Sequence, residues 1–361
     1  MNHLGRHLAV HVLGAVLLVI AVLLGLFAVV LFADELGDTE GKLSVMKLLS
    51  YIALRLPGIA VANAGFAMLI GCLMGLGVLA SQSELTVMRA SGVSVLRIVW
   101  MALRPMLALI LLTSLLGEFV VPNIERYASR MRTETFEKEQ PYNLINSDNG
   151  LWMRQENDFL HFNHVTSTGE IYGFARLSFG AQGDLQYAQY ASRAEHNGDK
   201  KNPGWILKGV RITRYNGDAV STAITEADEH WYSELDPGLL NVVVSEPADM
   251  SLQELRYYMN YLAMQGQESR AFELVFWQKI LQPLAMIGLV LVAISFIFGP
   301  LRDTTMGYRL FIGVMVGIVF RFSQDLLGPT SLVYGFPPLL AVSLPVFVCW
   351  MAGVFLLLRT R

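Results

Sequence analysis

The stretch VLGAVLLVIAVLLGLFAVVLFA, residues Val12–Ala33, contains no charged side chain. At about 1.5 Å per residue it is long enough to cross the ~30 Å apolar core of a bilayer as one α-helix. It is longer than the apolar part of a signal peptide, so we expect it to remain as a membrane helix. The whole chain is 53% hydrophobic and only 16% charged, which also indicates a membrane protein.

Further apolar runs have the composition of membrane helices. They are Pro57–Ala80, Ile98–Val121, Ile280–Phe298, Met306–Leu327 and Phe336–Leu358. The run Ile98–Val121 includes Arg104 and Glu118 near its ends, from which long side chains can reach the membrane surface. We therefore expect an α-helical membrane protein with six crossings, three before and three after a long polar insert.

Basic residues in the short loops predict how the chain is oriented. The loops and ends that would share one side contain Arg6, Arg89, Arg97, Arg302, Arg309, Arg359 and Arg361. Cytoplasmic loops of membrane proteins are enriched in Lys and Arg. We therefore expect both termini in the cytoplasm and the polar insert in the periplasm.

The insert, residues 122–270, has the pattern of a β domain. Short β-type runs are separated by Gly-Asp and Asn-Gly turn signals; the runs are Leu151–Arg154, Ile171–Phe179, Trp205–Tyr215 and Asn241–Ser245. This pattern predicts an antiparallel, jelly-roll-like domain inserted in the chain. Amphipathic helices are expected at Asn123–Lys138 and Ser251–Glu268. The predicted domains are residues 1–121, 122–270 and 271–361.

Motifs for catalysis are absent from the sequence. No G-x-x-x-x-G-K-[ST], H-E-x-x-H or G-x-S-x-G occurs, so we expect no enzyme and no bound ATP, cofactor or metal. The net charge of −3 gives no reason to expect nucleic acid as a partner. We interpret His161 and His164 as ordinary surface histidines, and Cys72 and Cys349 as small buried side chains.

The segment ASQSELTVMRASG, Ala80–Gly92, is the most informative loop. Ser81 and Glu84 have the spacing of a capping box, and Gly92 fits a helix stop. We therefore expect a short surface helix at about residues 81–92. A ridge for docking in a partner's groove would contain Ser83, Glu84, Val87, Met88 and Ser91. The alternative is a loop helix without a partner.

Three runs resemble the LptF/LptG family of lipopolysaccharide export permeases. They are GLGVLASQSELTVMRASG (Gly75–Gly92), SFIFGPLRDTTMG (Ser295–Gly307) and LGPTSLVYGFPP (Leu327–Pro338), and FGPLR and LVYG-x-PP fit the LptG branch better. The resemblance covers the chain in length and order. It implies an inner-membrane permease that extracts lipopolysaccharide from the outer leaflet and passes it to periplasmic β-jelly-roll proteins.

The resemblance also implies partners. These are an LptF-type permease subunit, a dimer of an LptB-type ATPase that uses ATP and Mg, and an LptC-type protein with a single membrane helix. The segment around Glu84 would be the coupling helix that seats in the ATPase. Two other functions stay open: a membrane-anchored assembly or signalling protein, and a related permease for lipoproteins.

Several residues are candidates for contact with the substrate. The resemblance matches Arg132 to a family arginine and Asp34 to an acidic position, while Leu31 stands where family members can carry a lysine. An arginine within a membrane helix is costly, so Arg321 is expected to face a cavity or partner and to meet the substrate's phosphates. Its alternative role is a local ion pair with Asp325 at i+4.

An apolar slot for acyl chains is expected inside the β domain. Its candidate lining residues are Trp152, Phe162, Ile171 and Phe174. Inward positions of a jelly roll alternate with outward ones, and a roll open at one end can hold an apolar ligand. A dry, packed core is the alternative.

Overall fold

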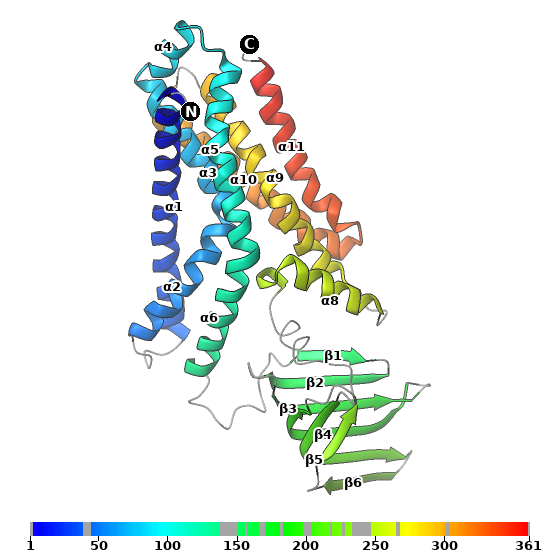
Figure 1. The fold of residues 1–361 in the computed structure, drawn as a ribbon. Helices are drawn as coiled ribbons and strands as arrows, with labels where there is room; N and C mark the ends of the chain where they lie inside the picture. Colours follow the sequence, from blue (N-terminus) through cyan, green and yellow to red (C-terminus); the bar gives the residue numbers. More distant parts are fainter. Residues whose placement is uncertain are drawn as a thin grey trace. The chain divides into compact units, whose positions relative to one another are not determined.

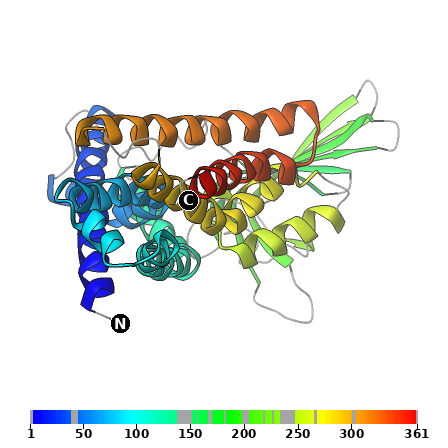
Figure 2. The ribbon, with the colours of Figure 1, turned by 90° about the horizontal axis from the view of Figure 1, so that it is seen from above.

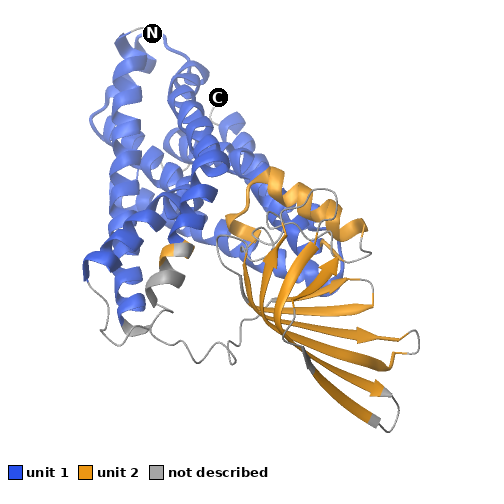
Figure 3. Ribbon diagram, turned by 60° about the horizontal axis from the view of Figure 1, so that its bottom comes forward, with its two compact units in different colours: residues 1–128, 270–361 blue, residues 129–269 orange. Residues whose placement is uncertain are grey.

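The computed structural model divides the chain into two compact units. It describes residues 3–359 apart from 39–44, 137–150, 156, 166–169, 181–182, 198–203, 217–218, 226–227, 233–246, 265–267 and 300–303. Unit 1 contains Met1–Ala128 and Arg270–Arg361, and unit 2 contains Ser129–Ser269 (Figure 3). The functional division at residues 121 and 270 stays a prediction.

Unit 1 is helical. Its helices are α1 His3–Asp38, α2 Val45–Ala62, α3 Ala64–Ser81, α4 Glu84–Ala90, α5 Val95–Leu115, the start of α6 Val121–Phe136, α9 Arg270–Phe298, α10 Met306–Tyr334 and α11 Pro338–Arg359, and a π-helical turn, Leu116–Val120, joins α5 to α6. Within the described residues, 7 helical segments are long and apolar enough to cross a membrane.

These segments correspond to the six predicted crossings, because α2 and α3 follow each other along one path and are divided only at Asn63. Both termini and α4 lie at one end of unit 1, and α1 ends and α2 begins at the opposite end (Figure 1). The membrane-spanning architecture predicted from the sequence is therefore confirmed, with one crossing made of two helices.

Small residues allow the helices of unit 1 to approach closely. A Cβ on Gly71 of α3 would lie 2.5 Å from Val16 Cα of α1, and a Cβ on Gly75 would lie 2.8 Å from Val12 Cα. This spacing of two glycines four residues apart is the small-xxx-small pattern that brings membrane helices together. The N-terminal half of α1 is therefore packed tightly on α3.

Helix α9 occupies the middle of unit 1. It packs against α3, α5, α10 and α11, and Figure 2 shows it between α10, α11 and α5. Gly313 and Gly317 of α10 repeat the close approach seen in α3, because their Cβ positions would collide with Leu73 and Phe66 of α3. Because α9 also packs against α3 and α5, these three helices form a packed core, and α10 lies against it through α3.

Unit 2 contains one antiparallel sheet. The strands are β1 Leu151–Gln155, β2 Asp158–Val165, β3 Ile171–Phe179, β4 Leu185–His196, β5 Gly204–Asn216, β6 Ala219–Thr225 and β7 Glu229–Tyr232. Their order is β1-β2-β3-β4-β5-β6, with β7 paired to β5 beside β6. The antiparallel β domain is confirmed, while the predicted strand Asn241–Ser245 lies outside the described residues.

Helices α6 and α8, Leu252–Met264, stand before and after the described strands, where amphipathic helices were predicted. A short 3-10 turn, Pro247–Asp249, precedes α8. Ser251 begins α8 with a capping box, since its hydroxyl accepts from the Glu254 backbone N–H at 3.3 Å and the Glu254 carboxylate accepts from the Ser251 N–H at 2.8 Å.

Two glycines change the side-chain alternation of the sheet. Gly173 in β3 has φ +68° and Gly209 in β5 has φ +63°, a conformation that side chains rarely adopt. A Cβ at Gly173 would also collide with the side chain of Asn163 on β2. As a result Ile171 and Phe174, three residues apart, are both fully buried, although strict alternation would place them on opposite faces.

Candidate functional site

The short helix α4 begins later than the sequence predicted. Ser81 is the last residue of α3, and its hydroxyl donates to the Val78 carbonyl at 2.8 Å. Ser83 precedes α4 with φ 62°, and no side-chain hydrogen bond caps the helix start. The predicted Ser81–Glu84 capping box is therefore wrong, because Glu84 is the first residue of α4 and not its third.

The predicted stop at Gly92 is confirmed. Gly92 has φ 89°, its N–H donates to the Arg89 carbonyl at 3.0 Å, and the Val93 N–H donates to the Met88 carbonyl at 3.1 Å. These two bonds form the Schellman motif that ends many helices at a left-handed glycine.

The predicted docking ridge of α4 is only partly exposed. Leu85 and Met88 are 4% and 5% exposed and belong to a core cluster with residues of α1, α3, α5 and α9. Val87 is 65% exposed, and Ser83 and Ser91 are also exposed. The placement of Met88 on an outward ridge is wrong, because its side chain anchors α4 to the chain's own core.

Glu84 has a partner within the chain. Its Oε2 lies 2.9 Å from Nε2 of His7 on α1, with side-chain exposures of 36% and 46%. The His7 ring also packs edge-on against His11, with ring centres 4.5 Å apart. The first turns of α1 therefore hold one oxygen of the Glu84 carboxylate, and α4 is tied to both α1 and α3.

Arg321 and Asp325 form an ion pair near the middle of α10. Arg321 Nε donates to Asp325 Oδ2 at 3.0 Å, and the side chains are 61% and 56% exposed. Arg321 stands fifteen residues after Met306, about 22 Å along a helix that is about 42 Å long. Charged groups at this depth avoid lipid and face a cavity or another protein.

The side of α10 that bears this pair can be identified by helical periodicity. Leu310 and Val314 pack against a cluster formed by Val19, Ala67 and Ile70, which belong to α1 and α3. With 3.6 residues per turn, Arg321 and Asp325 continue the stripe that Leu310 and Val314 begin. The ion pair therefore lies on the same stripe of α10 as Leu310 and Val314, further along the helix, where both of its side chains are more than half exposed.

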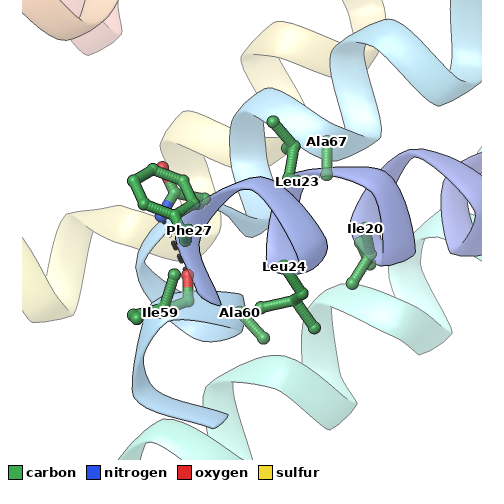
Figure 4. Close-up of a pocket in the computed structure, with 8 residues that line it drawn as sticks. Ile20, Leu23, Leu24, Phe27, Ile59, Ala60 and Ala67 are labelled. Atoms are coloured by element: carbon green, nitrogen blue, oxygen red, sulfur yellow. Dashed lines mark hydrogen bonds between the residues drawn. The ribbon is translucent and has the colours of Figure 1, made fainter. Parts of the chain in front are cut away.

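A shallow, partly open apolar pocket lies between α1 and the junction of α2 with α3 (Figure 4). Its lining residues are Ile20, Leu23, Leu24, Phe27, Ile59, Ala60, Asn63 and Ala67. Asn63 is the polar member, and its amide donates to the Ile59 carbonyl at 2.9 Å. Because the Asn63 amide donates to this carbonyl, the rest of the pocket lining is apolar.

The four β-domain candidates do not share one face. Phe162, Ile171 and Phe174 are buried to 1%, 0% and 0% exposure, and Phe162 packs on Phe174 with ring centres 5.9 Å apart. Trp152 is 59% exposed and lies on the opposite face, where its ring packs at a tilt against the His161 ring, with ring centres 4.5 Å apart. The prediction of Trp152 as an interior residue is wrong.

Two other candidates are placed as follows. Asp34 is exposed near the end of α1. Arg132 lies in α6, but its side chain is outside the described residues.

Burial lowers the pKa of His161 below its ordinary value, so this imidazole favours the neutral form.

An ion pair between α2 and α6 was missed. Arg55 Nη1 donates to Glu125 Oε2 at 2.6 Å, and Glu125 is only 5% exposed. Arg55 lies just before the apolar run that was chosen as the second crossing, and its partner stands 70 positions away. A charge next to an apolar run was the available signal, but it did not identify the partner.

The chain matches the family described as "Lipopolysaccharide export system permease LptF/LptG" over residues 6–359. It belongs to this family. The LptG protein of Escherichia coli strain K12 is 31% identical over 357 residues, which cover 99% of this chain and 98% of that protein. The LptG protein of Haemophilus influenzae is 30% identical over 362 residues, which cover 100% and 99%. Both relatives carry the name "Lipopolysaccharide export system permease protein LptG".

Proposed function

We propose that this chain is the LptG-type permease subunit of an ATP-driven lipopolysaccharide exporter in the inner membrane. The observation that carries the proposal is the match to LptG proteins along nearly their full length. The apolar helices of unit 1 support a multi-pass membrane subunit. ATP hydrolysis belongs to a separate LptB-type ATPase dimer, which uses ATP and Mg, and this chain binds no cofactor of its own.

The proposed orientation places both termini and α4 in the cytoplasm and unit 2 in the periplasm. The arginines of the short loops support it, since cytoplasmic loops retain basic residues. Lipopolysaccharide then leaves the outer leaflet through a cavity shared with an LptF-type subunit. It passes to periplasmic β-jelly-roll proteins, and an LptC-type protein completes the complex.

Helix α4 is proposed as the coupling helix. Its outward residues Ser83, Val87 and Ser91 can contact the ATPase, while Leu85 and Met88 anchor it to the packed core. His7 holds one oxygen of Glu84, so the remaining acceptor capacity is available to a donor on the ATPase. Glu84→Gln removes the charge and keeps an acceptor for His7. Normal ATPase assembly and normal transport in this variant would exclude an electrostatic role.

The pair on α10 is the proposed contact for substrate phosphates. A guanidinium can hold phosphate through two parallel hydrogen bonds, and Arg321 stands near the middle of the membrane-spanning helix α10 with its side chain more than half exposed. Arg132 and Asp34 remain proposed contacts near the end of the crossing helices. Entry of acyl chains between Phe162, Ile171 and Phe174 would require the sheet interior to open, because all three are buried.

Copurification tests the proposed function against its rivals. A transporter subunit is expected to bring down an ATPase whose hydrolysis responds to a lipid A-containing substrate. A membrane anchor would bring down no such ATPase. A lipoprotein permease would bring down an ATPase that responds to lipoprotein and not to lipopolysaccharide.

A further inference from the structure

Several membrane-spanning helices of unit 1 contain an irregularity, including prolines inside α2, α5, α10 and α11, and three of these irregularities contact one another. Asn63 divides α2 from α3, the π-helical turn Leu116–Val120 divides α5 from α6, and Pro283 lies inside α9. π-helical turns are rare and are often found at functional sites. A proline inside a helix removes one backbone hydrogen bond. Each segment can therefore bend at this point more easily than along its regular turns.

Val61, near the end of α2, connects the three irregularities. Its carbonyl accepts a hydrogen bond from the side-chain amide of Gln282, the residue before Pro283, at 3.0 Å. A Cβ on Gly117 in the π-helical turn would lie 3.0 Å from a methyl group of Val61. These three irregularities are therefore neighbours, connected through Val61.

The side-chain amide of Gln282 provides a hydrogen-bond donor within the membrane-spanning region. A carbonyl released by a helix break finds no water there, and leaving it unbonded costs free energy. Gln282 supplies such a donor to the Val61 carbonyl from a neighbouring helix, next to the division between α2 and α3. Gln282 is in this sense a positioning residue for the break.

Beyond the break, α2 and α6 are fixed to each other. Arg55 donates to Glu125, whose carboxylate is buried, at 2.6 Å. Gly58 permits this approach, since a Cβ there would collide with the Glu125 carboxylate. Breaking a buried ion pair leaves an uncompensated charge, which is unfavourable. Helix α2 and the first turns of α6 are therefore expected to move as one body.

The shallow apolar pocket borders the division between α2 and α3 on the side of α1. The shallow apolar pocket is lined there by Ile59, Ala60 and Asn63, at and next to the end of α2. The contact of α1 with α3 at Gly71 and Gly75 leaves no comparable room.

We infer that Asn63 and Leu116–Val120 form a joint, about which α2 and the start of α6 swing against the packed core of α3, α5 and α9. The inference rests on the proposed transport function and assigns the joint a role in its regulation. Helix α6 continues from the joint into the sequence of unit 2. The swing is a hinge motion that opens and closes the substrate route once in each ATP-driven cycle.

A reversible cross-link tests the joint in the complete exporter. In a background with Cys72→Ala and Cys349→Ala, the joint pair is Val61→Cys with Gly117→Cys. The control pair is Gly65→Cys with Met286→Cys, which joins α3 to α9 inside the packed core, where a Cβ on Gly65 would lie 3.5 Å from Met286 Cγ. Both exporters are reconstituted with their ATPase and partner subunits in vesicles that contain lipopolysaccharide.

Oxidation of the joint pair is expected to stop ATP-dependent release of lipopolysaccharide, and a reductant should restore it. The control pair should cross-link and continue to release substrate. Continued release by the fully cross-linked joint pair would overturn the inference, and so would failure of the joint pair to cross-link at all. A wild-type complex that releases no lipopolysaccharide would instead contradict the proposed function.

A second variant tests Gln282 independently of cross-linking. Gln282→Met keeps the length of the side chain and removes the donor to Val61. We expect less lipopolysaccharide released per ATP hydrolysed, with normal assembly of the complex. A ratio equal to that of the wild type would overturn the assigned role of Gln282.

Discussion

Arg321→Met is expected to weaken binding of lipopolysaccharide to the assembled exporter. The substitution removes the guanidinium near the middle of α10 and leaves a side chain of similar length. It also removes the 3.0 Å pair with Asp325, so two different losses are combined in one variant. The expected size of each loss separates a phosphate contact from a local ion pair.

The ion pair between Arg321 and Asp325 itself contributes little free energy. Both side chains are more than half exposed, and in the water-filled cavity that the proposed function places beside them an i,i+4 pair contributes about 0.3–0.5 kcal/mol. Its loss alone changes an equilibrium constant by about twofold. Hydrogen bonds to charged groups contribute about 1.5–3 kcal/mol, so a lost phosphate contact corresponds to about 10- to 150-fold weaker binding.

The assay is equilibrium binding of lipopolysaccharide to the purified complex with wild-type Arg321, Arg321→Met or Arg321→Lys. A second variant, Arg321→Met with Asp325→Leu, removes both charges and therefore avoids leaving a lone carboxylate in the membrane. It should lose about as much affinity as Arg321→Met, while Arg321→Lys should keep part of it. Full binding and transport by the exchange Arg321→Asp with Asp325→Arg would refute the phosphate contact, because the exchange preserves only the pair.

Three further predictions follow from burial. Met88→Ala should destabilise the chain by about 2–5 kcal/mol and Val87→Ala by less than about 0.5 kcal/mol in thermal unfolding; equal losses would contradict the placement of α4. Phe174→Ala should cost about 3–5 kcal/mol and Trp152→Ala far less, and the reverse order would contradict the two faces of the sheet. Burial lowers the pKa of His161 in the folded chain, so on acidification this imidazole is protonated more readily in the unfolded chain. The free energy of unfolding should therefore fall as the pH is lowered from about 7.5 to about 5.5. His161→Phe, which keeps a ring on Trp152, should reduce that fall in unfolding temperature, and an unchanged fall would exclude His161 as its source.

The membrane crossings could be predicted because their signal is local. An apolar run long enough for a bilayer has few alternatives to a helix, and each predicted run is helical in unit 1 over nearly its whole length. The first half of α2 was missed because Lys47 and Arg55 interrupt its apolar pattern. Hydropathy also cannot detect a division one residue long, such as Asn63, or a π-helical turn inside a continuous apolar segment.

The candidate sites depended on contacts that a sequence pattern does not contain. The spacing of Ser81 and Glu84 fits a capping box, but α3 extends through Ser81 and Glu84 pairs with His7, 77 positions away. In the sheet, a change of one residue exchanges the two faces. Trp152 pairs across from His161, whereas Met153 pairs with Leu160, so the tryptophan is outward and its neighbour inward.

The central claim is that this chain forms part of a lipopolysaccharide exporter. It is tested most directly by ATP-dependent release of lipopolysaccharide from vesicles reconstituted with the complex, using a soluble β-jelly-roll protein as acceptor. We predict release that requires ATP, the ATPase partner and this chain together. Transfer that is absent with all components present, or that continues without this chain, would contradict the claim.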